Sequence, residues 1–365
     1  MTSTHAQHSG YGHNYKELAL SQANCQPRLM RALIVGIGAV GGVVSTRALC
    51  AGIPVCLATR TEETAARLRT SGLRVSGVGG EGICVPGEVW PLEEYMDREK
   101  FDLILLATKA QDALDVSSSL LDLLSPSGTL LPIQNGAVPQ MISEKLGKDI
   151  VLGGLSNLGA TMTEPGVYRQ TNGGHLLIGE IRGGSSQRAT EVQRLLGKAV
   201  EVRTSPNIVG AIWAKLLLNC SVTTIGAVCA QTMRQYIMSD EGMQVFQRAY
   251  DEALGVAIAT GIRPQRMIVE PIPPGWPQPG MHREDYSAWV SQIVEAYGDI
   301  KPSMLQDFER KRLTEIDFIN GHVTRLGVTL GKPAPVNRAL TETVHSIEQG
   351  KIEPGPRRLR ELVVA

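Results

Sequence analysis

The sequence predicts an α/β amino-terminal part with a mainly parallel sheet, followed by an all-helical carboxy-terminal part. From Arg31 to about Val202, short β-rich runs alternate with helical patterns, which is the order that βαβ units produce. After Pro206 the pattern changes to long helical stretches without a clear strand. We expect a mobile amino-terminal extension and two domains, at residues 1–28, 29–205 and 206–365.

Length and charge narrow the class of protein. A chain of 365 residues is long enough for about two domains. Lys+Arg and Asp+Glu are both 36, so no charge excess suggests nucleic acid or an anionic membrane as the main partner. No uncharged apolar run approaches the roughly 18 residues that cross a bilayer, and residues 1–28 lack the apolar stretch of a secretory signal. We therefore expect a cytoplasmic protein.

The six cysteines show neither a CxxC pair nor metal-ligand spacing, and several lie in apolar runs. Such a distribution favours reduced, structural thiols in a cytosolic protein and predicts no metal site. The cysteines are Cys25, Cys50, Cys56, Cys84, Cys220 and Cys229.

The first predicted elements are a strand in RALIVG, a helix near Val40 to Ala51, a strand in IPVCLATR and a helix near Glu62 to Thr70. FDLILLATK (Phe101 to Lys109) is almost continuously apolar and predicts a central strand that is buried on both faces. GTLLPIQNG (Gly128 to Gly136) has the same form. Because ligands bind beyond the carboxyl ends of parallel strands, the polar ends of these two segments are expected in one crevice.

A glycine-rich turn follows the first strand and opens the first helix. In Gly36-Ile37-Gly38-Ala39-Val40-Gly41, the first glycine permits a tight turn and the second lets backbone amides approach a pyrophosphate. The third lets helix and strand pack closely. This context predicts a Rossmann-type dinucleotide site, and its expected cofactor-binding residues are Gly36, Gly38, Ala39, Val40 and Gly41.

Arg60 indicates which dinucleotide binds. NAD-binding proteins place an acid at the end of the second strand to bind the ribose 2′-hydroxyl, but here Thr59 and Arg60 stand at that end. A guanidinium suits a 2′-phosphate, so NADPH is favoured over NADH. The alternative is a surface ion pair between Arg60 and the nearby Glu62 or Glu63.

The helical part offers a cation and an amide on one helix face. Lys215 and Asn219 are four residues apart in TSPNIVGAIWAKLLLNC, so both can reach the same polarised carbonyl group. A lysine on a helix is more often a solvated cation. Farther along, Glu315 has an alternative role too, as an ion pair with Lys311 on the same helix. The expected core residues around it are Met304, Leu305, Phe308, Leu313, Ile316 and Ile319.

The motifs taken together resemble one known family. GIGAVG, LATKA, IQNG, WAKLLLNC, SMLQD, TEIDFING and PAPVNRAL occur in the order and spacing of the ketopantoate reductase family, over roughly Arg31 to Glu361. The resemblance implies a Rossmann domain and a helical domain with the active site between them, and NADPH-dependent reduction of 2-dehydropantoate in pantothenate biosynthesis. The substrate is then a small 2-oxo acid, and the sequence leaves open whether the protein is a homodimer.

The resemblance also implies roles for individual residues. Lys215 matches the catalytic lysine and would act as the general acid, with Asn135 orienting it or the carbonyl oxygen. Lys109 matches the lysine beside the nicotinamide ribose and the substrate. The remaining matches are Asn219 on the helix face of Lys215, Ser303 for the substrate carboxylate and Glu315 for the substrate hydroxyl.

Two departures from the family bear on the substrate. The family commonly has asparagine where this chain has Thr223, and often has asparagine where it has Ile300. Residues 270–299 look like an insertion beside Ser303, either a lid or a surface loop, with a Pro/Gly-rich segment that excludes helix. These features leave two other hypotheses: a relative that reduces a different 2-oxo acid or an imine, and a catalytically silent NADPH-binding regulator.

Overall fold

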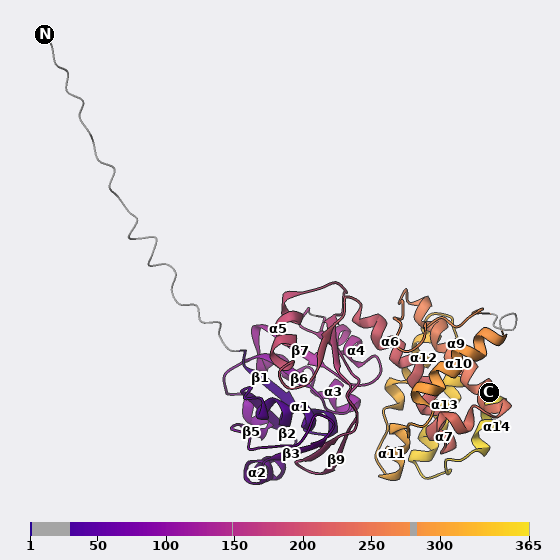
Figure 1. The fold of residues 1–365 in the computed structure, drawn as a ribbon, viewed down its shortest axis with the longest axis horizontal. Helices are drawn as coiled ribbons and strands as arrows, with labels where there is room; N and C mark the ends of the chain where they lie inside the picture. The colour runs from indigo at the N-terminus through magenta and orange to yellow at the C-terminus, as the bar shows by residue number, and fades with distance from the viewer. Residues whose placement is uncertain (2–29, 148, 278–282, 365) are drawn as a thin grey trace. The chain divides into compact units, whose positions relative to one another are not determined.

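The order of elements in the structure, a computed structural model, agrees with the sequence pattern. The structure describes Met1 and residues 30–147, 149–277 and 283–364. All twelve strands named in these residues lie before Pro206, in the indigo to magenta half of the chain in Figure 1, and the orange to yellow remainder is helical. The expected amino-terminal extension and Cys25 lie outside the described residues.

The principal sheet has five strands in the order β5-β2-β1-β6-β7, all parallel. β1 and β2 are buried along their whole length and β6 is buried except at Asp102, as the apolar runs predict. The order places the end of β1 between the ends of β2 and β6. The strands are β1 (Ala32–Val35), β2 (Val55–Thr59), β5 (Val89–Pro91), β6 (Phe101–Leu106) and β7 (Leu124–Pro132).

Helices connect these strands, as expected for βαβ units. Thr61 caps α2, because its Oγ1 accepts a hydrogen bond from the Thr64 amide at 3.3 Å. Ser186 caps α5 in the same way through Ala189. The elements are α1 (Ala39–Cys50), α2 (Glu62–Ser71), η1 (Leu92–Tyr95), α3 (Ala110–Val116), η2 (Ser119–Leu123), α4 (Val138–Leu146) and α5 (Gln187–Leu196).

Two smaller mixed sheets accompany the principal sheet, and the sequence pattern did not predict them. One has the order β4-β3-β10-β9 and the other β12-β11-β8, each with one parallel pairing and otherwise antiparallel ones. Their strands are β3 (Leu73–Gly77), β4 (Gly82–Cys84), β8 (Leu152–Ser156), β9 (Ala160–Glu164), β10 (Val167–Gln170), β11 (Leu176–Glu180) and β12 (Val202–Thr204).

The helical part begins at α6, and three residues separate this helix from the last strand, which ends at Thr204. The proposed boundary at residue 205 falls in this gap, and the division into two domains stays a prediction. The helices are α6 (Ile208–Leu218), the π-helical turn η3 (Asn219–Thr223), α7 (Thr224–Cys229), α8 (Met233–Tyr236), α9 (Asp240–Ala259), α10 (Arg283–Tyr297), α11 (Ser303–Glu309), η5 (Ile316–Phe318), α12 (Asn320–Thr329), α13 (Pro335–Glu348) and α14 (Arg357–Val363).

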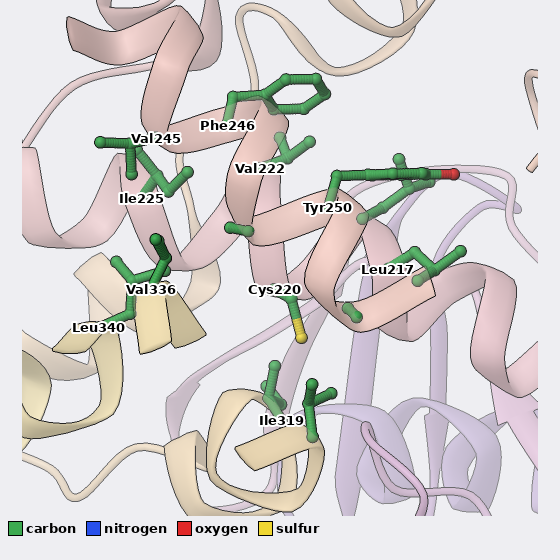
Figure 2. Packing of buried hydrophobic residues seen from close by; sticks show 14 of the residues in the cluster. Leu217, Cys220, Val222, Ile225, Val245, Phe246, Tyr250, Ile319, Val336 and Leu340 are labelled. Carbon is green, nitrogen blue, oxygen red and sulfur yellow. The ribbon is translucent and has the colours of Figure 1, made fainter. Parts of the chain in front are cut away.

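The core of the helical part packs around the α6–η3–α7 segment. Leu217, Cys220 and Ile225 from this segment meet Phe246 of α9 and Leu340 of α13, and all five are buried (Figure 2). Burying such side chains contributes about 1.5–3 kcal/mol each relative to exposure. This core fixes the helix that carries Lys215.

One helical segment, Ile208–Cys229, is long and apolar enough to cross a membrane, with a mean hydropathy of 1.6. Its most apolar window is 78% buried inside the protein, and Trp213, Leu216 and Leu217 pack in the core of the helical part. The segment is therefore a core helix.

The segment that carries Ser303 and Glu315 is broken, so these two residues do not lie on one continuous helix. α11 ends at Glu309, Lys311 adopts a left-handed φ of 50°, and Glu315 precedes the short turn η5. Leu313 in this break is 68% exposed, so its assignment to the core is wrong. Met304, Ile316 and Ile319 are buried as expected, and Leu305 and Phe308 pack against them.

The insertion at residues 270–299 forms part of the helical core. Trp289, Val290 and Ile293 of α10 are buried there, and Trp289 Nε1 donates to the Glu270 carbonyl at 2.7 Å. A surface loop is therefore a wrong description of α10. Residues 270–277 have neither helix nor strand, as their proline and glycine content predicts, while residues 278–282 lie outside the described residues.

Two cysteines contradict the expectation of reduced thiols. Cys50 at the end of α1 and Cys84 at the end of β4 form a disulfide with a Cα–Cα distance of 5.9 Å. Cys56, Cys220 and Cys229 are free and buried, as expected. The sequence shows no signal for the pair because its partners are 34 residues apart and meet only when β4 packs on α1.

Candidate active site

The glycine-rich turn has the conformation and the space that a pyrophosphate requires. Gly36 has a φ of 95°, and a Cβ there would lie 2.5 Å from the Thr108 amide nitrogen. A Cβ on Gly41 would lie 2.0 Å from the Gly36 carbonyl oxygen, which makes this the position of close packing. Gly38 has nothing within 4 Å of its Cβ position, and as the residue before α1 it offers no side-chain cap to the helix amides. A pyrophosphate therefore fits above Gly38 and α1.

Tyr168 packs against the glycine-rich turn and hydrogen-bonds to it, and the sequence did not single out this residue. Its hydroxyl donates to the Ile37 carbonyl at 3.1 Å, and its ring occupies the space that a Cβ on Gly42 would fill. Tyr168 lies on β10, so this contact depends on the unpredicted mixed sheet. No local pattern could have indicated it.

Two buried polar atoms lie at the neighbouring strand ends. Gln134 donates from Nε2 to the carbonyls of Leu106 and Thr108, at 2.9 and 3.1 Å. Its Oε1 and the Thr108 hydroxyl have no hydrogen-bond partner among the described residues. Buried polar groups are rarely left unpaired, so these atoms mark a place for a polar ligand. Together with the open Gly38, they fit a dinucleotide at this end of the sheet.

Arg60 follows β2, where the sequence places it, but its partner differs from the expected one. Its Nη2 lies 2.5 Å from Asp112 Oδ2, in the first turn of α3. Glu62, one of the two acids named as alternatives, pairs with Arg69 instead. The Arg60 side chain is 78% exposed, so its guanidinium remains accessible to a ligand.

Lys215 projects from α6 toward the α/β part. Its Nζ donates to the carbonyl of Ser156, the last residue of β8, at 2.6 Å. Asn207 caps the amino end of α6, because its Oδ1 accepts a hydrogen bond from the Gly210 amide at 2.9 Å. The alternative of a solvated surface cation is therefore wrong for Lys215.

Burial lowers the pKa of Lys215 to about 8, while the negative charge of Glu315 opposes this shift. An ammonium group with such a pKa is protonated at neutral pH and gives up its proton more readily than an ordinary lysine. The environment of Lys215 therefore suits a general acid.

Glu315 joins the two parts of the chain. Its Oε1 accepts from the Ala110 amide at 3.0 Å, and its Oε2 accepts from Asn135 Nδ2 at 3.1 Å. Ala110 opens α3, so the carboxylate also lies at the amino end of that helix, where negative charge is favoured. The proposed alternative, an ion pair with Lys311 on one helix, is wrong because Glu315 lies outside any helix.

A close backbone approach holds Glu315 in place. Gly136 has a φ of 75°, and a Cβ there would lie 2.1 Å from the Phe318 carbonyl oxygen. Gln111 adds a hydrogen bond from its Nε2 to the Thr314 carbonyl at 2.5 Å. The glycine of the QNG turn is thus needed for the segment of Glu315 to reach Asn135.

Lys109 forms an ion pair with Asp307 at 2.8 Å, and the acid is the more buried partner. Asp307 lies one turn after Ser303 on α11, so Ser303 is on the same helix face. Ser303 itself is exposed. The ion pair brings the end of β6 and α11 together, and it is a contact that the SMLQD motif alone did not indicate.

Asn219 lies one turn from Lys215, as the spacing predicts, but at the start of the π-helical turn η3. The backbone N–H of Asn219 donates to the Lys215 carbonyl. Its backbone carbonyl accepts from the hydroxyls of Thr223 and Thr224, each at 3.0 Å. Such turns inside helices occur often at functional sites. The hydroxyl of Thr223 therefore hydrogen-bonds to the backbone of its own helical segment. Ile300, the other position where the chain departs from the family pattern, is 55% exposed.

The structure brings Asn135 and Glu315 into hydrogen-bond contact and couples Lys215 to Glu315 electrostatically. Lys109 precedes Ala110, whose amide donates to Glu315. Asn219 directly follows α6, the helix of Lys215. Ser303 lies on α11 together with Asp307, the partner of Lys109. Thr108 and Gln134 lie in the polar strand ends that the sequence places in one crevice. The residues that the sequence did not indicate are Asp112, Ser156, Tyr168 and the partner of Lys109, Asp307.

No cluster of three or more metal-ligating side chains occurs in the described part of the chain.

Comparison with protein families finds two matching models. Residues 32–183 match the model described as Ketopantoate reductase PanE/ApbA, and residues 207–348 match Ketopantoate reductase PanE/ApbA C terminal. The two matches divide close to the change from α/β to helical structure.

Individual proteins agree with these matches. The chain is 28% identical to a 2-dehydropantoate 2-reductase of Archaeoglobus fulgidus, over 88% of this chain and 99% of the relative. A ketopantoate reductase structure from Ralstonia eutropha JMP134 has a TM-score of 0.74 and 25% identity, over 88% and 99% of the two chains. D-mandelate dehydrogenase, solved with NADH and anilino(oxo)acetate, shares the fold with a TM-score of 0.75 at 23% identity, over the same shares.

Proposed function

This chain belongs to the Ketopantoate reductase PanE/ApbA family of oxidoreductases, and from that premise we propose that it reduces ketopantoate to pantoate with NADPH. The proposal includes the cytoplasm as the place of the reaction and a role in pantothenate biosynthesis. When bound, NADPH supplies the hydride for the C2 carbonyl carbon.

Lys215 is the general acid of the proposed reaction. The carbonyl oxygen gains negative charge as C2 is reduced, and a nearby ammonium group stabilises that charge and then transfers its proton to the oxygen. The Ser156 carbonyl orients the ammonium group by accepting a hydrogen bond from one N–H, which leaves the other two N–H groups free to bond the substrate. The lowered pKa of Lys215 favours this transfer near neutral pH.

Asn135 and Glu315 form the second part of the proposed machinery. Asn135 Nδ2 donates to Glu315, and this hydrogen bond fixes the orientation of the Asn135 side-chain amide. The negative charge of Glu315 also keeps the pKa of Lys215 from falling further. Each carboxylate oxygen of Glu315 retains acceptor capacity beyond its one protein contact. We assign this capacity to the distal hydroxyl of ketopantoate.

The carboxylate of a 2-oxo acid needs donors that are separate from the carbonyl site. Ser303 offers a hydroxyl at the exposed start of α11, Asn219 offers an amide one turn from Lys215, and Lys109 offers a cation. We propose that these three groups bind the substrate acid. Arg60 and the turn from Gly36 to Gly41 then bind the cofactor, together with Lys109 and Asn135.

The observation that carries the proposal is the convergence of a half-buried lysine and a carboxylate from the helical part on the strand ends of the α/β part. The test compares kcat/KM for ketopantoate with that for 2-oxoisovalerate, which lacks the hydroxyl, at saturating NADPH. We expect ketopantoate to be favoured, because a site built to bond a hydroxyl rejects partners without one. Equal values would remove the proposed role of Glu315.

A second candidate is reduction of a different 2-oxo acid. It is supported by the loss of two family amides, since the Thr223 hydroxyl is committed to the Asn219 carbonyl and Ile300 has no polar group. The fold is shared with D-mandelate dehydrogenase, whose structure holds an aromatic oxo acid derivative. A panel of branched and aromatic 2-oxo acids separates the candidates: turnover of these without turnover of ketopantoate favours the second.

A further inference from the structure

The ion pair between Arg60 and Asp112 connects two strand ends that are not adjacent in the sheet. Arg60 follows β2, Asp112 lies in the first turn of the helix after β6, and β1 runs between those two strands. Neighbouring strands are about 4.8 Å apart, so the two side chains reach toward each other across the end of β1. The glycine-rich turn that receives the cofactor follows β1 directly.

Asp112 therefore brings a carboxylate to the place where the sequence shows only a cation. An acid near the end of the second strand is what NAD-binding proteins use to accept the ribose 2′-hydroxyl. Here that acid comes from α3, 52 residues away in the chain, and its side chain is 40% exposed. A 2′-phosphate that binds Arg60 must lie close to this carboxylate, and two like charges at short range repel.

Resting on the proposed function, we propose that Asp112 is a specificity-determining residue that limits the preference for NADPH over NADH. The carboxylate accepts the 2′-hydroxyl of NADH and opposes the 2′-phosphate of NADPH, while Arg60 favours the phosphate. The ratio of NADPH to NADH affinity thus depends on the opposing effects of one cation and one acid. Removal of the acid should raise this ratio.

The test measures dissociation constants of NADPH and NADH by nicotinamide fluorescence, for wild type and Asp112→Asn. We expect Asp112→Asn to bind NADPH about tenfold more tightly at low salt and NADH no more tightly, because a carboxamide removes the charge but keeps the size. Adenosine 2′,5′-bisphosphate and AMP, measured by competition, should show the same change in ratio, since they carry this end of the cofactor alone.

Asp115→Asn is the matched control, because Asp115 is an exposed acid on the same helix and its loss changes the net charge equally. Its ratio of NADPH to NADH affinity should stay within about twofold of wild type. Arg60→Ala should weaken NADPH and spare NADH. An unchanged ratio in Asp112→Asn, or an equal shift in Asp115→Asn, would overturn the role of Asp112 while both cofactors still bind. Binding of neither cofactor to wild type would overturn the proposed function as well.

Discussion

The two sides of the candidate site are built from different parts of the polypeptide. On the cofactor side, Gly36, Gly38 and Gly41 act by lacking side chains, and their spacing along the chain identifies them, while the distant Thr108 and Tyr168 pack against the turn. On the substrate side, Lys215 and Glu315 act through their side chains, and each depends on a contact far away in sequence. The turn on the cofactor side can therefore be recognised from local sequence, whereas the side chains on the substrate side come together only when the helical part packs on the strand ends.

The largest expected effect concerns the substrate side. Lys215→Ala should lower kcat by about 10²–10⁴, the usual contribution of a positioned general acid, while the dissociation constant of NADPH stays near its wild-type value. Steady-state kinetics and fluorescence titration measure the two quantities. Lys198→Ala, at an exposed lysine of the α/β part, serves as the control. Near-normal turnover of the Lys215 variant would mean that the proton has another source.

The cofactor side is tested by adding single methyl groups. Gly41→Ala should lower the free energy of unfolding by about 1–3 kcal/mol, because its Cβ would meet the Gly36 carbonyl oxygen at 2.0 Å. Gly38→Ala is the matched comparison, since its Cβ meets no atom within 4 Å and its φ is −78°. It should leave stability unchanged and weaken NADPH binding about tenfold, because backbone amides must approach the pyrophosphate there.

Denaturant unfolding and NADPH titration of these two variants separate packing from ligand approach. If Gly38→Ala bound NADPH as tightly as wild type, the open space above Gly38 would have no part in cofactor binding.

A third prediction concerns the hydroxyl that Glu315 is proposed to accept. Glu315→Gln should lower kcat/KM for ketopantoate about tenfold more than for 2-oxoisovalerate, because only ketopantoate loses a charge-assisted hydrogen bond. Glu309→Gln, on the exposed end of α11, is the control with the same chemical change. An equal loss for both substrates would assign Glu315 to structure alone.

The smallest expected effect is on the pH dependence. The pKa of Lys215 is about 8 and the active form is the protonated one, so kcat should be constant below that pH and fall as pH rises through it. The charge of Glu315 raises this pKa, so Glu315→Gln should move the midpoint to lower pH. Rate profiles between pH 6 and 10 measure the shift, and a midpoint that moves upward would contradict the coupling.

The sequence predicted the parallel sheet, the glycine-rich turn and the helical part because each depends on local patterns. Buried runs such as Phe101 to Leu106 and the GxGxxG spacing are visible without any knowledge of tertiary contacts. The prediction that Lys215 and Glu315 are site residues came from a family resemblance, because neither residue has a local signal that separates it from a surface charge.

The remaining features depend on contacts between distant segments. Asp112 is an ordinary acid in a first helical turn until β2 and β6 bring Arg60 to it. Likewise, the Cys50–Cys84 disulfide, the support of the turn by Tyr168 and the placement of Glu315 beside Asn135 require sheets or loops that the pattern did not show. The break between α11 and η5 has no clear sequence signal, because the apolar spacing across it resembles that of a continuous helix.

We propose above all that this chain converts ketopantoate to pantoate, with the helical part supplying the proton. The most direct measurement incubates the purified protein with ketopantoate and limiting NADPH, and then quantifies pantoate by mass spectrometry against the NADPH consumed. One pantoate formed for each NADPH oxidised, with no product from Lys215→Ala in the same time, is the result that we expect. NADPH that binds but is not oxidised in the presence of ketopantoate would contradict the claim.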